Sequence, residues 1–252
     1  MLNVKDRLRA SSIHLGISLA LAGLVATLVF GLWYPYPYRE ISGGRDLFLL
    51  LVAVDVVMGP LITLMIFNRA KPRRELMLDL TVVGLLQLAA LGYGLWTVAA
   101  ARPVHLVFEY QRMAVVSAAE VDPAALAQAA PALRALPLTG PTLLSLRPFK
   151  DANEQYDSTV LAMGGVPQAA QPALWQAWDA AHADILKESR PAAQLKQRFG
   201  AEAALIDSAI AATGRPLEAL RYLPLLGRKK GWTVLIDAQS AQPVGFLPLD
   251  SF

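Results

Sequence analysis

The residue with the clearest chemical consequence is Asp55, because it is the single charged residue in an apolar run of 21 residues, 47–67. A carboxylate in the middle of a membrane-spanning helix costs about 2.5–3.5 kcal/mol on insertion scales, so it should face protein and have a polar partner. At 1.5 Å per residue, Gln87 of the next apolar run lies within roughly 7–8 Å of Asp55 in depth, and Tyr93 lies closer. Two interpretations stay open: a polar contact that holds the helices together, or a polar socket for another protein's transmembrane helix.

Two features of the apolar runs bear on how they pack. Gly59 and Pro60 follow Asp55 at i+4 and i+5, and a proline inside a helix frees the carbonyl four residues earlier, here that of Val56. We therefore expect a kink beside Asp55. In the first run, small residues recur every four positions and favour close helix packing, within the bundle or with a partner: Ser18, Ala22 and Ala26.

Residue types that carry catalysis or bind metals are scarce. Without cysteine, the chain has no thiolate nucleophile, zinc ribbon, iron–sulfur site or disulfide. Its three histidines, His14, His105 and His182, lie in separate segments and are interpreted as structural or surface residues. Glycine-rich nucleotide and phosphate loops, H-E-x-x-H and G-x-S-x-G are missing from the sequence. We predict no catalytic residue, no cofactor and no metal site.

Two side-chain clusters have simple structural explanations. Two aromatic residues and a histidine share a helical face at i, i+3 and i+7: Trp175, Trp178 and His182. This spacing predicts a helix that packs on a sheet rather than a cofactor site. Three carboxylates gather where a helix should begin: Asp151, Glu154 and Asp157. Helix capping explains them better than calcium, because no EF-hand spacing follows.

The composition indicates a membrane protein. The chain is 55% hydrophobic and 17% charged, against about 45–50% and 25% in soluble domains. The apolar excess is concentrated in three runs of 21 or 22 residues, 13–34, 47–67 and 80–101. Because a spanning helix needs about 20 residues, the sequence predicts three transmembrane helices within an N-terminal domain, 1–102. The first run is too long for a cleaved signal peptide.

The distribution of basic residues predicts the orientation. The first loop, 35–46, carries only Arg39 and Arg45, whereas the N-terminal tail and the second loop carry more: Lys5, Arg7 and Arg9, and Arg69, Lys71, Arg73 and Arg74. By the positive-inside rule, the N-terminus and the second loop are cytoplasmic, and everything after residue 101 is exported. In a Gram-negative cell that compartment is the periplasm. Residues 1–102 carry a net charge of +4 and residues 103–252 of −1, so no nucleic-acid partner is expected.

The exported half, 103–252, reads as an α+β domain. Strands are predicted from alternating apolar residues, with 104–110 and 113–118 as a hairpin and further strands at 142–146, 220–226, 232–237 and 243–247. Helices are predicted from Asp122–Pro123 onward and at 151–163, 171–189 and 192–213. We expect an antiparallel sheet of about five strands with helices inserted in the middle of the domain. One basic run, 228–230, falls in a predicted turn and is solvated or contacts lipid phosphates or an acidic partner.

Three segments carry a resemblance to a known family. They are DVVMGPLITLMIFNRAKPRRELMLDL, LLQLAALGYGLWTVAAARPVHLVFEYQRMAVV and RYLPLLGRKKGWTVLIDAQSAQPVGFLPLD. Together they resemble the TfpX/TfpZ family of type IV pilin accessory proteins over essentially the whole chain. The matching positions are Asp55, Gly59, Pro60 and Thr63; Asn68, Lys71, Glu75 and Asp79; Arg102, Pro103, Phe108 and Glu109; and Tyr222, Leu223, Pro224 and Asp237. His105 stands where the family often has an aromatic residue.

The resemblance implies a multi-pass helper in the bacterial inner membrane that acts on the major type IV pilin. It would be a pilin-specific chaperone or assembly modulator rather than an enzyme. Pilin presents an apolar helix and a periplasmic head, so we expect the bundle around Asp55, Gln87 and Tyr93 to contact the helix. The exported domain would contact the head. Other pilus assembly proteins and the lipid bilayer are further expected partners.

Two alternatives from other classes remain. A membrane enzyme acting on pilin or its glycan would need a cluster of polar residues in one exported pocket, and Glu109, Arg112 and Asp237 are scattered. A ligand-sensing membrane protein would need a cytoplasmic output, but the predicted cytoplasmic parts are a tail and a loop of 12 residues each.

Overall fold

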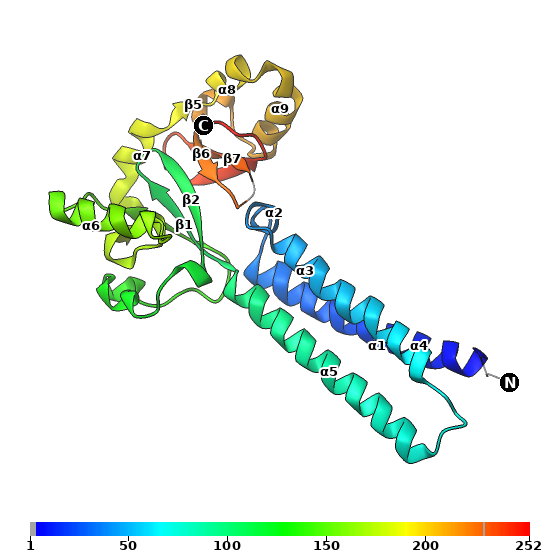
Figure 1. The fold of residues 1–252 in the computed structure, drawn as a ribbon. Helices are drawn as coiled ribbons and strands as arrows, with labels where there is room; N and C mark the ends of the chain where they lie inside the picture. Colours follow the sequence, from blue (N-terminus) through cyan, green and yellow to red (C-terminus); the bar gives the residue numbers. More distant parts are fainter. Residues whose placement is uncertain (1–3, 229) are drawn as a thin grey trace. The chain divides into compact units, whose positions relative to one another are not determined.

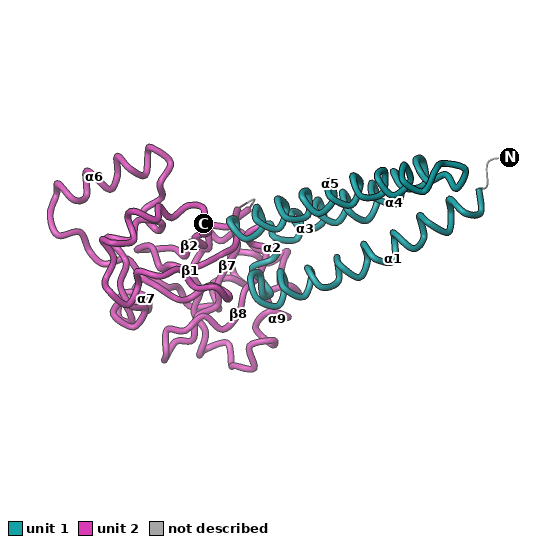
Figure 2. Tube along the Cα trace, turned by 90° about the horizontal axis from the view of Figure 1, so that it is seen from below, with its two compact units in different colours: residues 1–39, 43–101 teal, residues 40–42, 102–252 magenta. Residues whose placement is uncertain are grey.

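The computed structural model describes residues 4–228 and 230–252 and divides into two compact units, shown as a ribbon in Figure 1 and by colour in Figure 2. Unit 1 holds residues up to 39 and 43–101, and unit 2 holds residues 40–42 and 102–252. The short segment 40–42 belongs to unit 2 because the backbone N–H of Arg228 donates to the carbonyl of Ile41 at 3.0 Å. Lys229, in the predicted basic turn, lies outside the described residues.

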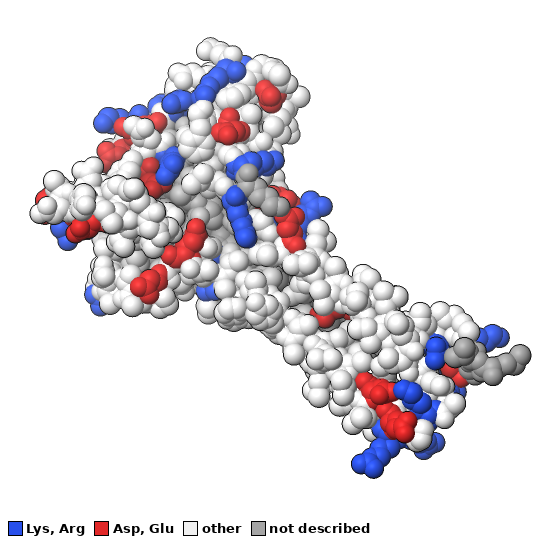
Figure 3. Space-filling view, in the orientation of Figure 1, with Lys and Arg blue, Asp and Glu red and all other residues white. Residues whose placement is uncertain are grey.

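Unit 1 consists of helices long and apolar enough to cross a membrane, which confirms the predicted three-helix bundle. The helical segments up to residue 100 are α1 (Val4–Leu28) continued by a π-helical Val29–Trp33, a short α2 (Tyr38–Ile41), α3 (Gly44–Val52), a π-helical Ala53–Met58, α4 (Gly59–Ile66) and α5 (Arg73–Ala100). Of these, α2 extends into the segment 40–42 of unit 2. The first and third helices begin earlier than the apolar runs, because backbone hydrogen bonding continues into polar residues. In Figure 3 the middle of the bundle carries almost no charged atoms, as a lipid-facing surface requires.

Beside Asp55, where a kink was predicted, the second spanning helix departs from regular α-helical hydrogen bonding. Residues Ala53–Met58 are π-helical, and Pro60 stands at the start of α4. Proline has no N–H to offer to the carbonyl four residues earlier, so the regular ladder cannot continue there. The hydroxyl of Ser11 on α1 donates to the Pro60 carbonyl at 2.9 Å, which ties the interruption to the first helix.

One end of the bundle has a small core of its own. Tyr34 is fully buried with Val29 and Val98, and its hydroxyl donates to the Val98 carbonyl at 3.0 Å. Gly44 packs directly on the Tyr34 ring. This contact fixes where the second spanning helix begins relative to the first.

Unit 2 is an α+β domain built on one sheet, which confirms the predicted class. Within the described residues its strands are β1 (Pro103–Glu109), β2 (Arg112–Ser117), β3 (Thr142–Leu146), β4 (Trp175–Ala177), β5 (Arg190–Pro191), β6 (Leu220–Leu226), β7 (Gly231–Asp237) and β8 (Pro243–Leu247). The order is β4-β3-β1-β2-β6-β7-β8, with β5 beside β6. The sheet is mixed rather than wholly antiparallel, because β1 pairs with β3 and β2 with β6 in parallel. Parallel neighbours need a crossover connection, which residues 118–141 provide between β2 and β3.

The sheet has two halves joined at a narrow seam. Strand β2 pairs with β6 only at Met113–Leu225 and Ala114–Leu226, while β5 occupies the other end of the same edge of β6. Each half has its own apolar core. One lies around β1 to β4 and includes Trp175, and the other lies under β6 to β8 and includes Tyr222.

The helix predicted from Asp122–Pro123 is wrong. The segment forms only the 3₁₀ turns Ala125–Gln128 and Pro131–Leu133. Pro131 cannot donate a backbone hydrogen bond and its ring clashes with the preceding turn, so an α-helix cannot continue through it. The alanine residues of this segment have a high helix propensity, but Pro131 interrupts the series of backbone hydrogen bonds that an α-helix needs.

The helix predicted at 171–189 is also wrong for most of its length. It contains strand β4 and only the short α7 (His182–Glu188). Trp175, Trp178 and His182 therefore share no helical face. The indole N–H of Trp175 donates to the Ala169 carbonyl at 2.8 Å while its ring fills the first core, so tertiary packing overrides the local pattern. The third predicted helix forms as α8 (Ala193–Arg198) and α9 (Ala203–Ala212), separated at Gly200.

The carboxylate cluster at the start of α6 (Ala152–Met163) is structural, as predicted. Asp151 caps the helix by accepting the Glu154 backbone N–H at 2.8 Å. Arg147 binds Glu154 through two nitrogens, at 2.6 and 2.9 Å. The bond from Arg147, followed by the Lys150 backbone N–H, lowers the pKa of Glu154 from 4.5 to about 2.

Replacing this carboxylate should change the acid sensitivity of the domain. A depressed folded pKa gives a contribution that is present above pH 4.5 and is lost as the pH falls toward about 2. Glu154→Gln should therefore show a smaller fall in melting temperature over this interval than the unmodified protein, measured by circular dichroism. Asp157→Asn on the same helix is the control, because it leaves the Arg147–Glu154 pair in place. An unchanged slope in Glu154→Gln would contradict the assignment.

Candidate functional site

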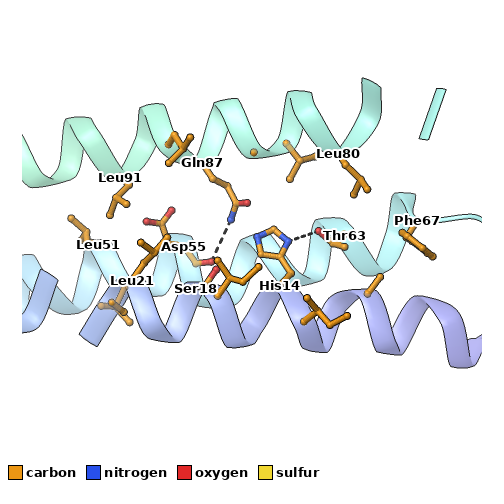
Figure 4. Close-up of a pocket in the computed structure, with 18 residues that line it drawn as sticks. His14, Ser18, Leu21, Leu51, Asp55, Thr63, Phe67, Leu80, Gln87 and Leu91 are labelled. Atoms are coloured by element: carbon orange, nitrogen blue, oxygen red, sulfur yellow. Dashed lines mark hydrogen bonds between the residues drawn. The ribbon is translucent and has the colours of Figure 1, made fainter. Parts of the chain in front are cut away.

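The candidate site is a cavity of about 460 Å³ inside unit 1, which we call the bundle cavity (Figure 4). Most of its lining is apolar, and its polar groups come from all three spanning helices. The lining residues are Ala10, Ile13, His14, Ile17, Ser18, Leu21 and Ala22 of α1; Leu51, Val52, Asp55, Thr63 and Phe67 of the second span; and Leu80, Val83, Gly84, Gln87, Leu88 and Leu91 of α5. Helix α1 and helix α5 form its walls, with the second span between them.

Asp55 contributes an unsatisfied carboxyl oxygen to this cavity. Its Oδ1 is buried and has no hydrogen-bond partner among the residues that the structure describes. Gln87 lies next to it, but its Nε2 donates at 3.4 Å to the backbone carbonyl of Asp55 rather than to the carboxylate. Gln87 is therefore the neighbour of Asp55 that the depth along the helices predicted. In the tertiary structure, however, it bonds the main chain of Asp55 and not the carboxylate.

A second polar pair lies about two helical turns further along the second span. Nδ1 of His14 and the hydroxyl of Thr63 are 2.6 Å apart, and Thr63 is buried. Figure 4 shows His14 reaching from α1 and Gln87 from α5 toward the same stretch of the second span. Sequence reasoning left His14 as an isolated histidine. Its depth in the first helix, matched against that of Thr63 in the antiparallel second helix, is the signal that could have paired them.

Gly59 makes this convergence possible. A Cβ at position 59 would lie 1.8 Å from Nε2 of Gln87 and 3.2 Å from Nε2 of His14. Only a residue without a side chain lets both groups approach the second span here. Pro60 beside it is buried, and its carbonyl accepts the Ser11 hydroxyl.

Tyr93, the other expected neighbour of Asp55, is not part of the cavity lining. Its side chain is 71% exposed and stacks against Trp96, with ring centroids 5.9 Å apart. Such aromatic side chains suit a lipid-facing position near the membrane interface.

The expected positions at the start of unit 2 serve the fold. Pro103 is the first residue of β1, and Arg102 donates to the Pro137 carbonyl at 3.5 Å. Phe108 is buried in the same strand. Glu109 is buried and paired with Arg112 at 2.7 Å across the β1–β2 hairpin, whose antiparallel pairing was predicted.

The expected positions near the chain's end are also structural. Tyr222 is buried in the second core, and both Tyr222 and Pro224 line a smaller, polar cavity of about 410 Å³ at the seam of the sheet. Asp237 accepts from the backbone N–H and hydroxyl of Ser240 at 2.7 and 2.8 Å and pairs with Arg215. The Ser240 bonds are the main cause that lowers the pKa of Asp237. It closes the turn between β7 and β8.

These polar groups do not converge on one catalytic centre. In unit 2 the carboxylates of Glu109, Glu154 and Asp237 each pair with an arginine in a different part of the domain. Over residues 4–228 and 230–252, no group of three or more histidine, aspartate or glutamate side chains could hold a metal ion. The bundle cavity is an apolar chamber that contains a hydrogen-bond acceptor without a donor.

Comparison with known proteins places the chain in a family. Residues 2–43 match the family "Fimbrial assembly protein FimB". A fimbrial assembly protein of Dichelobacter nodosus serogroup I is 36% identical over 91% of this chain and 90% of its own length, and the serogroup E1 protein is 33% identical over the same shares. The protein of serogroups C1 and C2 is 38% identical over 113 residues. No solved structure matches the chain significantly. Because the likeness extends through both units, this protein belongs to the FimB family of fimbrial assembly proteins.

Proposed function

We propose that the protein is a TfpX/TfpZ-type accessory protein of type IV pilus biogenesis that binds the major pilin, as a chaperone or assembly modulator. The observation that carries the proposal is the full-length likeness to fimbrial assembly proteins, which includes both the spanning helices and the α+β domain. A pilin subunit in the membrane has an apolar helix and a folded head. A helper with a membrane unit and a folded domain has one binding surface for each part.

The proposed location is the inner membrane, with the N-terminus in the cytoplasm and residues 103–252 in the periplasm. The distribution of basic residues supports this orientation. Near the proposed cytoplasmic face, Lys71 pairs with Asp79 at 2.6 Å and Arg69 with Asp6 at 3.5 Å. The remaining basic residues there can bind anionic lipid headgroups.

The proposed action is binding rather than catalysis. Three carboxylates of unit 2, those of Glu109, Glu154 and Asp237, are paired with arginine. A general acid or base needs a free position within hydrogen-bond reach of a substrate. The bundle cavity offers an acceptor at Asp55, and His14, the other titratable side chain of its lining, is bonded to Thr63.

Photo-crosslinking in the producing bacterium tests this function. A photoreactive residue at Leu88, in the cavity lining, should form an adduct with pilin, and so should one at the exposed Tyr156 of unit 2. Leu86, 66% exposed on α5 but outside the cavity, is the matched control and should give little adduct. If neither Leu88 nor Tyr156 captures pilin while the protein is fully expressed, the proposed function is wrong.

A further inference from the structure

We propose that the bundle cavity receives a transmembrane helix of a partner protein, and that Asp55 accepts a hydrogen bond from a polar side chain which that helix carries at mid-membrane. The inference rests on the proposed function in one respect, since a membrane-embedded subunit is the partner that function requires. The chemistry of recognition comes from the cavity itself.

Oδ1 of Asp55 has no hydrogen-bond partner among the described residues. A buried acceptor without a partner is destabilising because it has lost its hydrogen bonds to water, and a charged group is more so. Two polar side chains of the lining near Asp55 bond elsewhere: His14 with Thr63, and Gln87 with the main-chain carbonyl of Asp55. The isolated bundle therefore carries a destabilising group that an incoming donor would satisfy. A residue that served only to hold the helices together would be expected to bond one of them.

The bundle cavity is elongated along the spanning helices. Its lining runs along α1 from Ala10 to Ala22, about 18 Å at 1.5 Å per residue, which is more than three helical turns. Small residues on both walls, Ala10 and Ala22 on α1 and Gly84 on α5, let another backbone approach closely. Only 6% of the apolar window of α5 is buried within the structure, so this helix has much surface left for a partner.

Asp55 favours a helix over a lipid as the occupant of the cavity. An acyl chain would fill the apolar part of the cavity, but it has no donor and would leave Oδ1 of Asp55 unsatisfied. A helix side chain such as that of asparagine brings both apolar neighbours and a donor. Interhelical hydrogen bonds in membranes contribute about 1–2 kcal/mol in model peptides, which corresponds to roughly 5- to 30-fold in affinity.

Binding of synthetic helices to the full-length protein in bicelles tests the inference directly. The probes are two labelled Leu/Ala peptides of spanning length, one with a central asparagine and one with leucine at that position. The unmodified protein should bind the asparagine peptide at least about 5-fold more tightly. Asp55→Leu should remove the preference without lowering the melting temperature of the peptide-free protein. Asp79→Asn, outside the cavity, should keep the preference.

Two glycine variants of α5 test the same inference without changing Asp55, in case Asp55→Leu folds poorly. A Cβ meets no atom within 4 Å at either Gly84 or Gly92 of α5, but only Gly84 lines the cavity. Gly84→Leu should therefore weaken binding of the asparagine peptide, while Gly92→Leu should leave it unchanged. Equal effects of these two variants would overturn the inference.

The outcomes distinguish this inference from the proposed function. Equal binding of the two peptides, or a preference that survives Asp55→Leu, overturns the inference even if pilin is captured from the cell. An Asp55-dependent preference supports the inference even if pilin capture fails, in which case the partner is another membrane helix. A phospholipid that stays bound in native mass spectrometry and excludes both peptides, or an Asp55-dependent contact between two copies of this chain, also overturns it.

Discussion

Gly44→Ala should destabilise the helical bundle by about 3 kcal/mol, the upper end of the usual cost of overpacking. A Cβ at position 44 would lie 2.2 Å from Cδ1 and 2.6 Å from Cε1 of Tyr34. The Tyr34 ring is fully buried, and its hydroxyl bonds the Val98 carbonyl. It can move away only by losing that bond and disturbing the core around Val29. Thermal unfolding of the full-length protein in detergent, followed by circular dichroism, measures the loss.

Gly16→Ala is the matched control for this prediction. Gly16 lies inside α1, and a Cβ there meets no atom within 4 Å. Alanine is intrinsically better than glycine within a helix, by about 1 kcal/mol, so the control should be neutral or slightly stabilising. A Gly44→Ala protein as stable as Gly16→Ala would show that the Tyr34 contact does not fix the helices as described.

His105→Phe should remove much of the acid sensitivity of unit 2 between pH 6.5 and about 4. Burial lowers the pKa of His105 from 6.5 to about 4, so the unfolded chain binds a proton in this interval that the folded domain does not. Stability conferred by the neutral ring is therefore present above pH 6.5 and is lost as the pH falls toward 4, by about 3 kcal/mol in all. Nε2 of His105 is buried without a partner, so a proton placed there would meet no acceptor.

Hydrogen exchange of the full-length protein measures this effect in the right place. Protection of the strands β1 and β3 should fall on acidification in the unmodified protein and fall much less in His105→Phe. The phenyl ring can keep the edge-on contact with Trp175, whose ring lies 4.7 Å away, although the bond from His105 to Thr142 is lost. His182→Phe is the control, because it leaves His105 in place. An equal acid response in both variants would contradict the assignment.

Both interpretations of Asp55, as a contact within the bundle and as a socket for a partner helix, required a polar neighbour. The position of that neighbour in depth could be predicted from the sequence, but the direction of its side chain could not. Helical rise alone brought Gln87 near Asp55 in depth. The direction of the Gln87 side chain, toward a main-chain carbonyl, depends on helix rotation and on the space at Gly59. Neither can be deduced from spacing along one chain. The pairing of His14 with Thr63 was missed for the same reason, since it joins two helices.

The segments that resemble pilin accessory proteins and the segment that matches the FimB family model lie in different parts of the chain. The segments that suggested a pilin accessory family lie in the second span, at the start of unit 2 and near residue 252. The FimB family match lies at residues 2–43, in the first helix and the segment after it. The long alignments with the Dichelobacter nodosus proteins join these regions.

The sequence by itself determined the three apolar helices and the strands with alternating apolar residues. High hydropathy over about 20 residues and an alternation of apolar and polar residues are local properties of the sequence. They predict a spanning helix and a strand, respectively, whatever the rest of the chain contacts. The interruption beside Asp55 was equally local, because Pro60 lacks the hydrogen-bond donor wherever it is placed.

Only the tertiary structure decided the rest. The segment 171–189 has a helical spacing of aromatic residues, yet Trp175 joins the edge of the sheet because β3 offers free hydrogen-bonding groups and the first core has room for its ring. The parallel pairing of β1 with β3 depends on which edges remain open after the hairpin forms. Whether Asp55 is satisfied depends on three helices at once. Long-range contacts decided these features, because the free energy of burial and pairing exceeds the small local preferences that a sequence displays.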